Sequence, residues 1–399
     1  MQQKGCVLEF ASKVADVTTI EAHQPKGLQP VEPVLPDYKG ACIAGVLPAL
    51  AKRADGAPQW LPEAAREAAQ VVLLAIDGLG WRQLQARRDI APVLCSGMGQ
   101  AITSVAPSTT ATALTSLSTG TVPAQHGLVG YRLKLCDDRV MNVLRWSDCT
   151  GDLRQRVPAR TFQPMPAFPG MSPGVPAVTR SEFALTGFTA AHLGEARAVG
   201  WKVASTMVVQ VARLVRGGSP FVYAYYDGLD KVSHEWGLQS EFDAELKAVD
   251  SMVGDLVSEL PESCALVVTA DHGQVQVDSA SLVIGSTVMD KVRLLSGEGR
   301  FRWLHAIPGA EEDLLAAASE AFGGVAWVSS VDDLSERGWF GGPLSAVVRS
   351  RLGDVALVAR EPVSFLDPAD TGESRLLGRH GSLTDAEMWV PLLAWRGGR

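Results

Sequence analysis

The chain has 399 residues, of which 46% are hydrophobic and 20% are charged, a balance typical of a globular protein with a sizeable core. The formal net charge of −8 leaves no strong basic field for a nucleic-acid backbone, which excludes polymeric DNA or RNA as an expected partner. Six cysteines are scattered without a Cys-x-x-Cys pair, so neither a structural zinc knot nor a redox motif is expected.

Residues 1–38 are expected to be an N-terminal extension that carries no chemistry. Lys, Glu or Asp interrupts every apolar run near the start, so we expect neither a signal peptide nor a transmembrane span. The text that follows, LQPVEPVLPDY, is rich in proline and weakly periodic, which favours an extension lying on the surface. The sequence therefore predicts a cytoplasmic protein with free thiols and no membrane partner.

Four largely apolar runs are expected to form parallel strands that are buried on both faces. Helical patterns separate them, as in a doubly wound, mostly parallel α/β sheet. The runs are QVVLLAI from residue 70, QAITSVAP from residue 100, FVYAYY from residue 221 and CALVVTA from residue 264. Between the last two runs, apolar residues recur at helical spacing after Ser240, which is expected to form a capping box with Asp243.

Two other segments differ from this strand and helix pattern. Residues 157–178 are too rich in Pro and Gly for regular structure, and they form either a rigid surface linker or a loop that shapes the rim of a pocket. Residues 282–362 contain strand-like RFRWLHAI, VAWVSS and DVALVAR and helix-like GAEEDLLAAASEAF. We expect them to form a small α+β insertion, or cap, in a catalytic domain made of residues 39–281 and 363–399.

Polar residues follow three of the predicted strands, at the edge where open α/β sheets place their ligands. Asp77 follows the first strand, Asp230 and His234 follow the third, and Asp271 and His272 close the fourth. Each pair alone is typical turn or helix-cap chemistry, but together the residues indicate a metal site. Carboxylates and imidazoles without thiolates suit catalytic zinc (Zn²⁺), and manganese (Mn²⁺) would also be accepted.

The second predicted strand leads into hydroxyl residues, APSTTATALTSLSTG, that open an apparent helix. The free N–H groups of a helix start favour an anionic phosphoryl group, and a hydroxyl there can attack phosphorus if a metal or a base assists it. The alternative is that Ser108 is only a helix N-cap and that Thr109, Thr110 and Thr112 are ordinary helix residues.

Five blocks of the sequence resemble, in the same order, the nucleotide pyrophosphatase/phosphodiesterase family of the alkaline phosphatase superfamily. They are AIDGLG, PSTTATALTSLSTGTVPAQHG, YYDGLDKVSHEWG, TADHG and RHGS. The resemblance implies an alkaline-phosphatase-like fold, a structural His126 and a reaction that passes through phosphothreonine at Thr110. It also implies two divalent metal ions, one held by Asp77, Thr110, Asp271 and His272, and the other by Asp230, His234 and His380.

Two departures from the family pattern bear on the substrate. Ala111 follows Thr110 where the family has a Phe-Pro-Asn type of run, and Tyr131 occupies the place of an asparagine that binds a phosphoryl oxygen. Tyr131 and Arg132 are expected to contact the substrate instead. The sequence predicts a phosphodiesterase or nucleotide pyrophosphatase acting on small phosphoesters. The alternatives are a phosphomonoesterase, a phosphonate hydrolase or a catalytically silent metal-binding protein.

Overall fold

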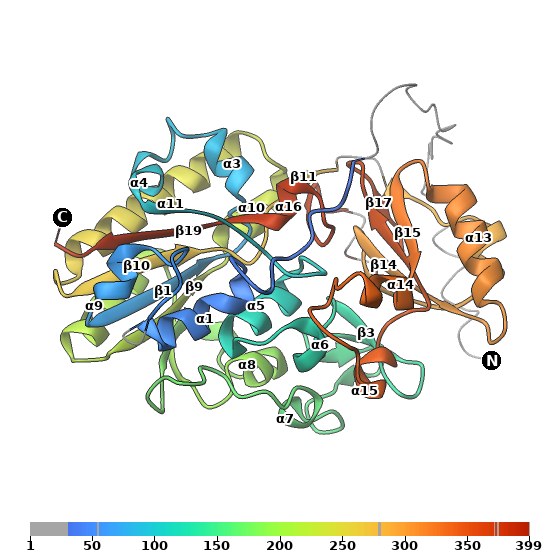
Figure 1. The fold of residues 1–399 in the computed structure, drawn as a ribbon, viewed down its shortest axis with the longest axis horizontal. Helices are drawn as coiled ribbons and strands as arrows, with labels where there is room; N and C mark the ends of the chain where they lie inside the picture. The colour runs from blue at the N-terminus through green and yellow to red at the C-terminus, as the bar shows by residue number, and fades with distance from the viewer. Residues whose placement is uncertain (1–30, 54–55, 278–280, 371, 373–374, 399) are drawn as a thin grey trace. The chain divides into compact units, whose positions relative to one another are not determined.

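A seven-stranded sheet with the order β2-β19-β10-β1-β9-β7-β8 carries the elements that lead to the predicted site (Figure 1). The computed structural model describes residues 31–53, 56–277, 281–370, 372 and 375–398, so most of the predicted N-terminal extension lies outside the described residues. The strands are β1 (Gln70–Ile76), β2 (Met98–Thr103), β7 (Pro176–Arg180), β8 (Arg197–Trp201), β9 (Phe221–Tyr226), β10 (Cys264–Thr269) and β19 (Trp389–Arg396).

Five neighbouring strands of this sheet are parallel. β1 pairs in parallel with β9 and β10, and β7 does so with β8 and β9, whereas β19 is antiparallel to both β10 and β2. β1, β9 and β10 are buried over nearly their whole length, as expected of strands that are covered on both faces. Figure 1 shows helices on both faces of the sheet. The predicted doubly wound, mostly parallel sheet is confirmed.

The prediction for the second apolar run is wrong about its place in the sheet. β2 lies at the edge and pairs with the antiparallel β19, and its first three residues are exposed. The reason is that the distant β19 inserts between β10 and β2. The hydropathy of β2 alone gives no sign of this insertion.

Two local predictions also need correction. Residues 157–178 contain the short helix α7 (Ala159–Phe162), and β7 begins within them at Pro176. Proline is tolerated at the first residue of a strand, so the segment ends in regular structure after all. The predicted helix is present as α11 (Ser240–Glu259), but its N-cap is Gln239, and the Ser240 hydroxyl donates to Glu241 instead of closing a capping box.

Helices cover both faces of this sheet. Figure 1 shows α3 and α11 on one face, and α1 with α5 on the other. The bounds are α1 (Ile43–Ala51), α3 (Trp81–Gln85), α5 (Thr110–Thr119), α6 (Pro123–His126), α8 (Gly187–His192), α9 (Ala204–Arg216), α10 (Gly228–Trp236) and α16 (Asp385–Met388).

A four-stranded antiparallel sheet forms within the predicted insertion. Its order is β13 (Val292–Glu298), β14 (Phe301–Ala306), β16 (Val355–Ala359) and β15 (Ala326–Ser330), and α13 (Glu311–Phe322) packs on it over a separate buried cluster. Residues 33–399 nevertheless form one compact unit, so the boundaries of the insertion stay a prediction. A second small sheet, β3 (Arg132–Lys134), β4 (Val140–Asn142), β5 (Ser147–Asp148) and β6 (Gly151–Asp152), was not predicted.

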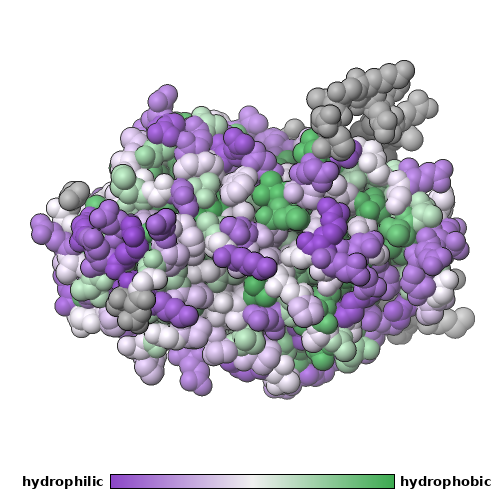
Figure 2. Space-filling view, in the orientation of Figure 1, coloured by the Kyte–Doolittle hydropathy of each residue, from purple (hydrophilic) through white to green (hydrophobic). Residues whose placement is uncertain are grey.

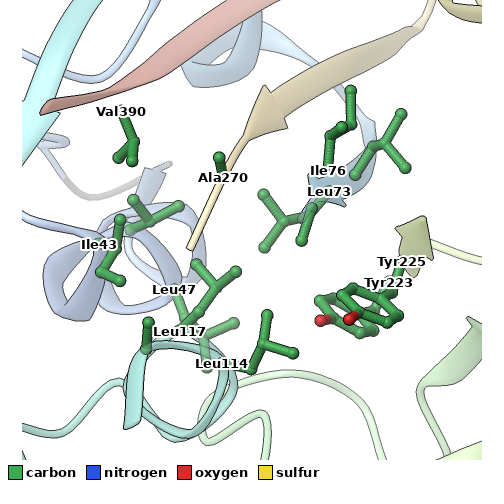
Figure 3. Close-up of a cluster of buried hydrophobic side chains, with 14 of the residues drawn as sticks. Ile43, Leu47, Leu73, Ile76, Leu114, Leu117, Tyr223, Tyr225, Ala270 and Val390 are labelled. Carbon is green, nitrogen blue, oxygen red and sulfur yellow. The ribbon is translucent and has the colours of Figure 1, made fainter. Parts of the chain in front are cut away.

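Buried side chains fix α5 against the strand ends. Figure 3 shows Leu114 and Leu117 of α5 close to Leu47 of α1 and Leu73 of β1, and all four are almost fully buried. Complete burial of a leucine side chain stabilises the fold by roughly 2 kcal/mol. This packing holds the first residue of α5, Thr110, at the edge of the sheet where β1, β9 and β10 end.

The surface is mixed in polarity. Figure 2 shows hydrophilic side chains spread over the face in view, with hydrophobic ones in separate small groups. Among the described residues, every helix is too short or too polar to cross a membrane.

Candidate active site

The candidate ligands come together at the carboxyl ends of β1, β9 and β10. Asp77 directly follows β1, and Asp230 and His234 lie four residues apart on α10, which follows β9. Asp271 and His272 follow β10, where the strand ends at Thr269. The two side chains are therefore free of the alternation of a strand, which would point them to opposite faces.

One group of residues surrounds the Nε2 atom of His272. This atom lies 3.3 Å from Asp77 Oδ1, 3.2 Å from Asp271 Oδ2 and 3.1 Å from the Thr110 hydroxyl. His272 and Asp271 are fully buried, and Asp77 and Thr110 are 3% and 7% exposed. The structure thus brings together the whole set that the resemblance assigns to one metal ion.

The other group surrounds Asp230. His234 Nε2 lies 3.2 Å from Asp230 Oδ2, and His380 Nε2 lies 3.8 Å from Asp230 Oδ1. The rings of His380 and His272 stack with their centroids 3.5 Å apart, so the two groups adjoin each other. Ligand atoms within 4.8 Å of one another define two possible metal clusters, Asp230 with His234 and His380, and Asp77 with Asp230 and His272. Asp230 therefore belongs to both clusters, whereas the resemblance placed it in one.

His380 reaches the site through a contact between two loops. Ser108 and Gly381 form an isolated antiparallel bridge, in which the Ser108 N–H donates to the Gly381 carbonyl at 3.1 Å. Gly381 has a φ of 122°, a conformation that L residues with side chains rarely adopt. The loop before α5 and the segment after β18 (Gly378–Arg379) are thereby joined, although 272 residues separate His380 from Ser108.

The three imidazoles share one orientation. Nδ1 of His234 lies 2.7 Å from the Gly378 carbonyl, Nδ1 of His272 lies 3.0 Å from the Gly273 carbonyl, and Nδ1 of His380 lies 3.1 Å from the Ser108 carbonyl. A carbonyl only accepts, so each Nδ1 carries the proton and each Nε2 presents a lone pair. These lone pairs face carboxylate oxygens, an arrangement that repels unless a proton or a metal cation lies between them.

The buried carboxylates on the Asp77 side also favour a bound cation. Burial, reinforced by the charges of Asp271 and Asp230, raises the pKa of Asp77 well above its ordinary value. Burial also raises the pKa of Asp271, with a further contribution from Asp230. Asp77 Oδ1 and Asp271 Oδ2 are buried without a hydrogen-bond partner among the described residues. Buried carboxylate oxygens and imidazole lone pairs that converge in this way fit divalent metal ions.

The imidazoles on the Asp230 side have opposite pKa shifts. Burial lowers the pKa of His234, but the Asp230 carboxylate outweighs burial and raises the pKa overall. For His380, burial and the neighbouring His272 hold the pKa well below its usual value. Burial alone would raise the pKa of Asp230, but His234 and the other imidazoles lower it. This carboxyl group therefore stays ionised.

The hydroxyl groups at the start of α5 have separate roles. The N-cap of α5 is Thr109, which makes no side-chain cap hydrogen bond, so the reading of Ser108 as N-cap is wrong. Ser108 instead donates to the Ser382 carbonyl at 2.6 Å, and the Thr112 hydroxyl is buried without a partner among the described residues. Thr110 is the hydroxyl of this group that contacts a candidate ligand, His272.

The two predicted substrate contacts lie outside these clusters. The buried Arg132 guanidinium donates to Asp367, and Asp370 lies 3.9 Å away. The Tyr131 hydroxyl accepts a hydrogen bond from the Asn142 side chain. The charge of Arg132 is thus already paired, and a contact of Tyr131 or Arg132 with substrate stays a prediction.

His126 is held inside the fold away from the clusters. The Leu128 N–H donates to its Nδ1 at 3.1 Å, so its Nε2–H donates to the Ser116 hydroxyl at 2.9 Å. Burial lowers the pKa of His126 to about 3, which keeps the ring neutral.

Two polar residues that the sequence reasoning missed contact the candidate ligands directly. The Tyr225 hydroxyl donates to Asp77 Oδ2, and the Gln274 side-chain amide donates to Asp230 Oδ1. The signals that could have found them are a tyrosine within a buried apolar strand and an amide two residues after His272. Each position is costly for a polar group that has no partner.

Comparison with known proteins places the chain in a family. The profile of the family described as type I phosphodiesterase / nucleotide pyrophosphatase matches residues 71–383. A search of curated proteins finds no significant match. Murine ectonucleotide pyrophosphatase / phosphodiesterase 5 has a similar structure, with 17% identity, a TM-score of 0.58, and coverage of 82% of this chain and 87% of that one. The inactive threonine-to-alanine variant of that murine protein, in complex with AMP, has 16% identity, a TM-score of 0.59, and coverage of 82% of this chain and 88% of that one.

A second kind of enzyme shares the fold. Phosphonoacetate hydrolase from Sinorhizobium meliloti 1021, in complex with phosphonoformate, has 20% identity, a TM-score of 0.59, and coverage of 82% of this chain and 90% of that one. At these identities the structural similarity shows the fold alone. The family profile, however, matches most of the chain and includes every candidate ligand from Asp77 to His380. This chain therefore belongs to the type I phosphodiesterase / nucleotide pyrophosphatase family, as a hydrolase of phosphoester bonds with an alkaline-phosphatase-like fold.

Proposed function

We propose that this protein is a metal-dependent phosphodiesterase or nucleotide pyrophosphatase that hydrolyses small phosphoesters through a phosphothreonine at Thr110. The observation that carries the proposal is the place of the Thr110 hydroxyl. It lies at the first residue of α5 and 3.1 Å from His272 Nε2, inside a buried set of carboxylates and imidazoles. A hydroxyl in such a place has both an activating environment and an anion-binding helix start beside it.

The residues that would hold two divalent ions fall into the two groups described above. Asp77, Thr110, Asp271 and His272 would hold one, and Asp230, His234 and His380 the other, with Asp230 also within reach of the first group. Histidine and carboxylate donors favour Zn²⁺, with Mn²⁺ as the alternative. Bound ions would lower the pKa of a hydroxyl or water and offset the charge that develops on the phosphoryl oxygens.

The chain itself would position both the nucleophile and the phosphoryl group. In the first step the Thr110 hydroxyl loses its proton and its oxygen forms a bond to phosphorus, while the bond from phosphorus to the leaving oxygen breaks and that oxygen takes up a proton. The first turn of α5 supports this step, because its earliest intrahelical N–H donor is that of Ala113, and the N–H groups of Thr110, Ala111 and Thr112 have no backbone acceptor among the described residues and can bind phosphoryl oxygens. In the second step water attacks the phosphothreonine, and the Thr110 hydroxyl is restored as the product leaves.

The names of the structural neighbours support a small substrate. The murine protein was captured with AMP in a variant that lacks a threonine and is called inactive, and the Sinorhizobium enzyme was captured with phosphonoformate. By analogy, a small phosphate or phosphonate suits this site, and Thr110 is the natural counterpart of an essential threonine. Phosphonate hydrolysis is the second candidate, because Tyr131 replaces the asparagine expected of a diesterase and the fold is shared with a phosphonate hydrolase.

Matched chromogenic substrates test the proposal and separate its alternatives. Bis(p-nitrophenyl) phosphate, p-nitrophenyl phosphate and phosphonoacetate should be compared with the protein stripped by a chelator and then reconstituted with Zn²⁺ or Mn²⁺. We expect turnover of the diester that requires added metal. Faster hydrolysis of the monoester or of phosphonoacetate would favour the alternatives. Failure to hydrolyse any of the three with bound metal would favour a silent metal-binding protein.

A further inference from the structure

In each of the three buried carboxylates, one oxygen accepts a hydrogen bond and the other faces an imidazole. Asp271 Oδ1 accepts from the Gly78 N–H at 3.1 Å and from the His272 N–H at 3.0 Å, while its Oδ2 faces the His272 ring. Asp77 Oδ2 accepts from Tyr225, while its Oδ1 faces the same ring. Asp230 Oδ1 accepts from Gln274 and also lies 3.8 Å from His380 Nε2, while its Oδ2 faces His234. A donor thus fixes one oxygen of every carboxylate.

Two of these donors are side chains and can be removed separately. We propose that Tyr225 and Gln274 are positioning residues for the metal centre, Tyr225 for the Asp77 group and Gln274 for the carboxylate that both clusters share. The inference rests on the proposed function only in requiring that the protein binds divalent ions. A hydrogen bond to one oxygen of a carboxylate fixes its rotation, which aims the other oxygen at the imidazoles.

The Tyr225 hydroxyl reaches from β9 to Asp77, which follows the neighbouring strand β1. The residue lies near the end of β9, the neighbour of β1, and Asp77 directly follows β1. Its ring is buried and lies 6.3 Å from the ring of Phe183. Tyr223 lies on the same face of β9, as Figure 3 shows, and is also buried. Its hydroxyl, however, lacks a hydrogen-bond partner among the described residues. The two tyrosines differ in whether the hydroxyl reaches a candidate ligand.

Gln274 is held from both sides. Its main-chain carbonyl accepts a hydrogen bond from the Gln83 side-chain amide at 2.6 Å, and Gln274 is fully buried. It also packs over Gly78, where an added Cβ would lie 2.6 Å from the Gln274 nitrogen and where φ is +74°. A side chain at residue 78 would displace the amide from Asp230. The glycine after Asp77 therefore makes room for the donor to Asp230, which couples the two ligand-bearing loops.

The test measures metal affinity without any substrate. Tyr225→Phe removes only a hydroxyl, and Gln274→Met keeps the volume but removes the donor. Wild-type protein and variants should be stripped and titrated with Zn²⁺ against a chromogenic chelator, and the visible absorption spectrum of the Co²⁺-loaded forms should be recorded. Loss of such a supporting hydrogen bond typically weakens metal binding by about 10- to 100-fold.

The two variants have different expected outcomes. Tyr225→Phe should weaken one of the two bound ions by about 10- to 100-fold, because Asp77 belongs to one cluster, while Gln274→Met should weaken both, because Asp230 belongs to both. The Co²⁺ spectrum should change in each variant. Affinities within about threefold of wild type would overturn the proposal, and weakening of a single ion in Gln274→Met would overturn the shared role of Asp230.

Two controls separate positioning from general loss of stability. Tyr223→Phe makes the same chemical change on the same strand, and Gln163→Met removes another fully buried amide, which donates to the Ala191 carbonyl at 2.7 Å. Both should leave metal affinity and the Co²⁺ spectrum unchanged even if they lower the melting temperature. Equal loss of affinity in the controls would overturn the inference. A wild-type protein that binds no ions would overturn the proposed function as well.

Discussion

Replacing Thr110 by alanine is expected to stop turnover while leaving the fold in place. The side chain is 7% exposed and its hydroxyl contacts His272 at 3.1 Å, so Thr110→Ala removes one buried methyl group and one hydrogen bond. The methyl group contributes about 1 kcal/mol and the hydrogen bond about 1 kcal/mol. A loss of about 2 kcal/mol in the free energy of unfolding is tolerable for a protein of ordinary stability.

The effect on activity should be far larger than the effect on stability. Removal of a nucleophile that acts as part of a unit lowers kcat by about four to six powers of ten, and the remaining rate reflects positioning and direct attack by water. Thr110→Ser keeps the attacking oxygen and should retain a measurable fraction of wild-type activity. Steady-state kinetics on a nitrophenyl diester, together with metal analysis of each variant, would measure both effects.

A quenched reaction locates the covalent intermediate directly. Turnover stopped with acid, followed by peptide mapping, should place the phosphoryl group on Thr110. Thr112→Val is a matched control because the Thr112 hydroxyl is buried without a described partner. Ser108→Ala should cost roughly 1 kcal/mol of stability and little activity. Phosphate on Ser108, Thr109 or Thr112 would refute the assignment of the nucleophile, and full activity of Thr110→Ala without a phosphoenzyme would refute the covalent route.

Three further predictions concern the metals and the buried histidines. Elemental analysis of protein purified without chelator should find about two Zn²⁺ or Mn²⁺ ions per chain, and no more than traces would contradict the ligand assignment. His380→Ala should reduce the occupancy of one ion and the activity together, whereas retention of both would leave the segment after β18 with a structural role only. Burial lowers the pKa values of His126, His192 and His305 to about 3, 4 and 3, so these rings are neutral in the folded protein at neutral pH. Their stabilising effect is present above pH ~6.5 and is lost as the pH falls towards ~3, with a slope of up to about 4 kcal/mol per pH unit. Urea unfolding measured from about pH 7 to about pH 4 should show this loss, and a flat profile would contradict the buried neutral rings.

Much of the sheet could be predicted from the local hydropathy of the sequence. β1, β9 and β10 are continuous apolar runs because both faces of each strand are covered, and the polar residues that follow them mark the edge where the strands end. Asp230 and His234 could be paired from their helical spacing alone. The place of β2 could not be predicted, because the pairing partner that decides it, β19, is distant in sequence.

The remaining site features depend on contacts that spacing does not encode. His380 could be assigned only through the family resemblance, since a loop contact between Ser108 and Gly381 brings it to the site. Arg132 looked available for substrate because Asp367 lies 235 residues further along the chain. Tyr225 read as one more aromatic residue of a buried strand, and its hydrogen bond to Asp77 follows from strand pairing across β1 and β9.

The insertion of β19 between β10 and β2 has a consequence for how the molecule assembles. β2 leads into α5, and β2 joins the sheet by pairing with β19. The nucleophile is therefore anchored through β19, which begins at Trp389, far along the chain from the end of β10 at Thr269. Closing so long a loop is entropically unfavourable until the pairing on both edges of β19 compensates for it, so we expect this pairing to form late in folding. A folding intermediate that already contains β1, β9 and β10 would hold most of the carboxylates but not the loop contact between Ser108 and Gly381. Tight metal uptake would then mark the last stage of folding, and its time course would report when β19 docks.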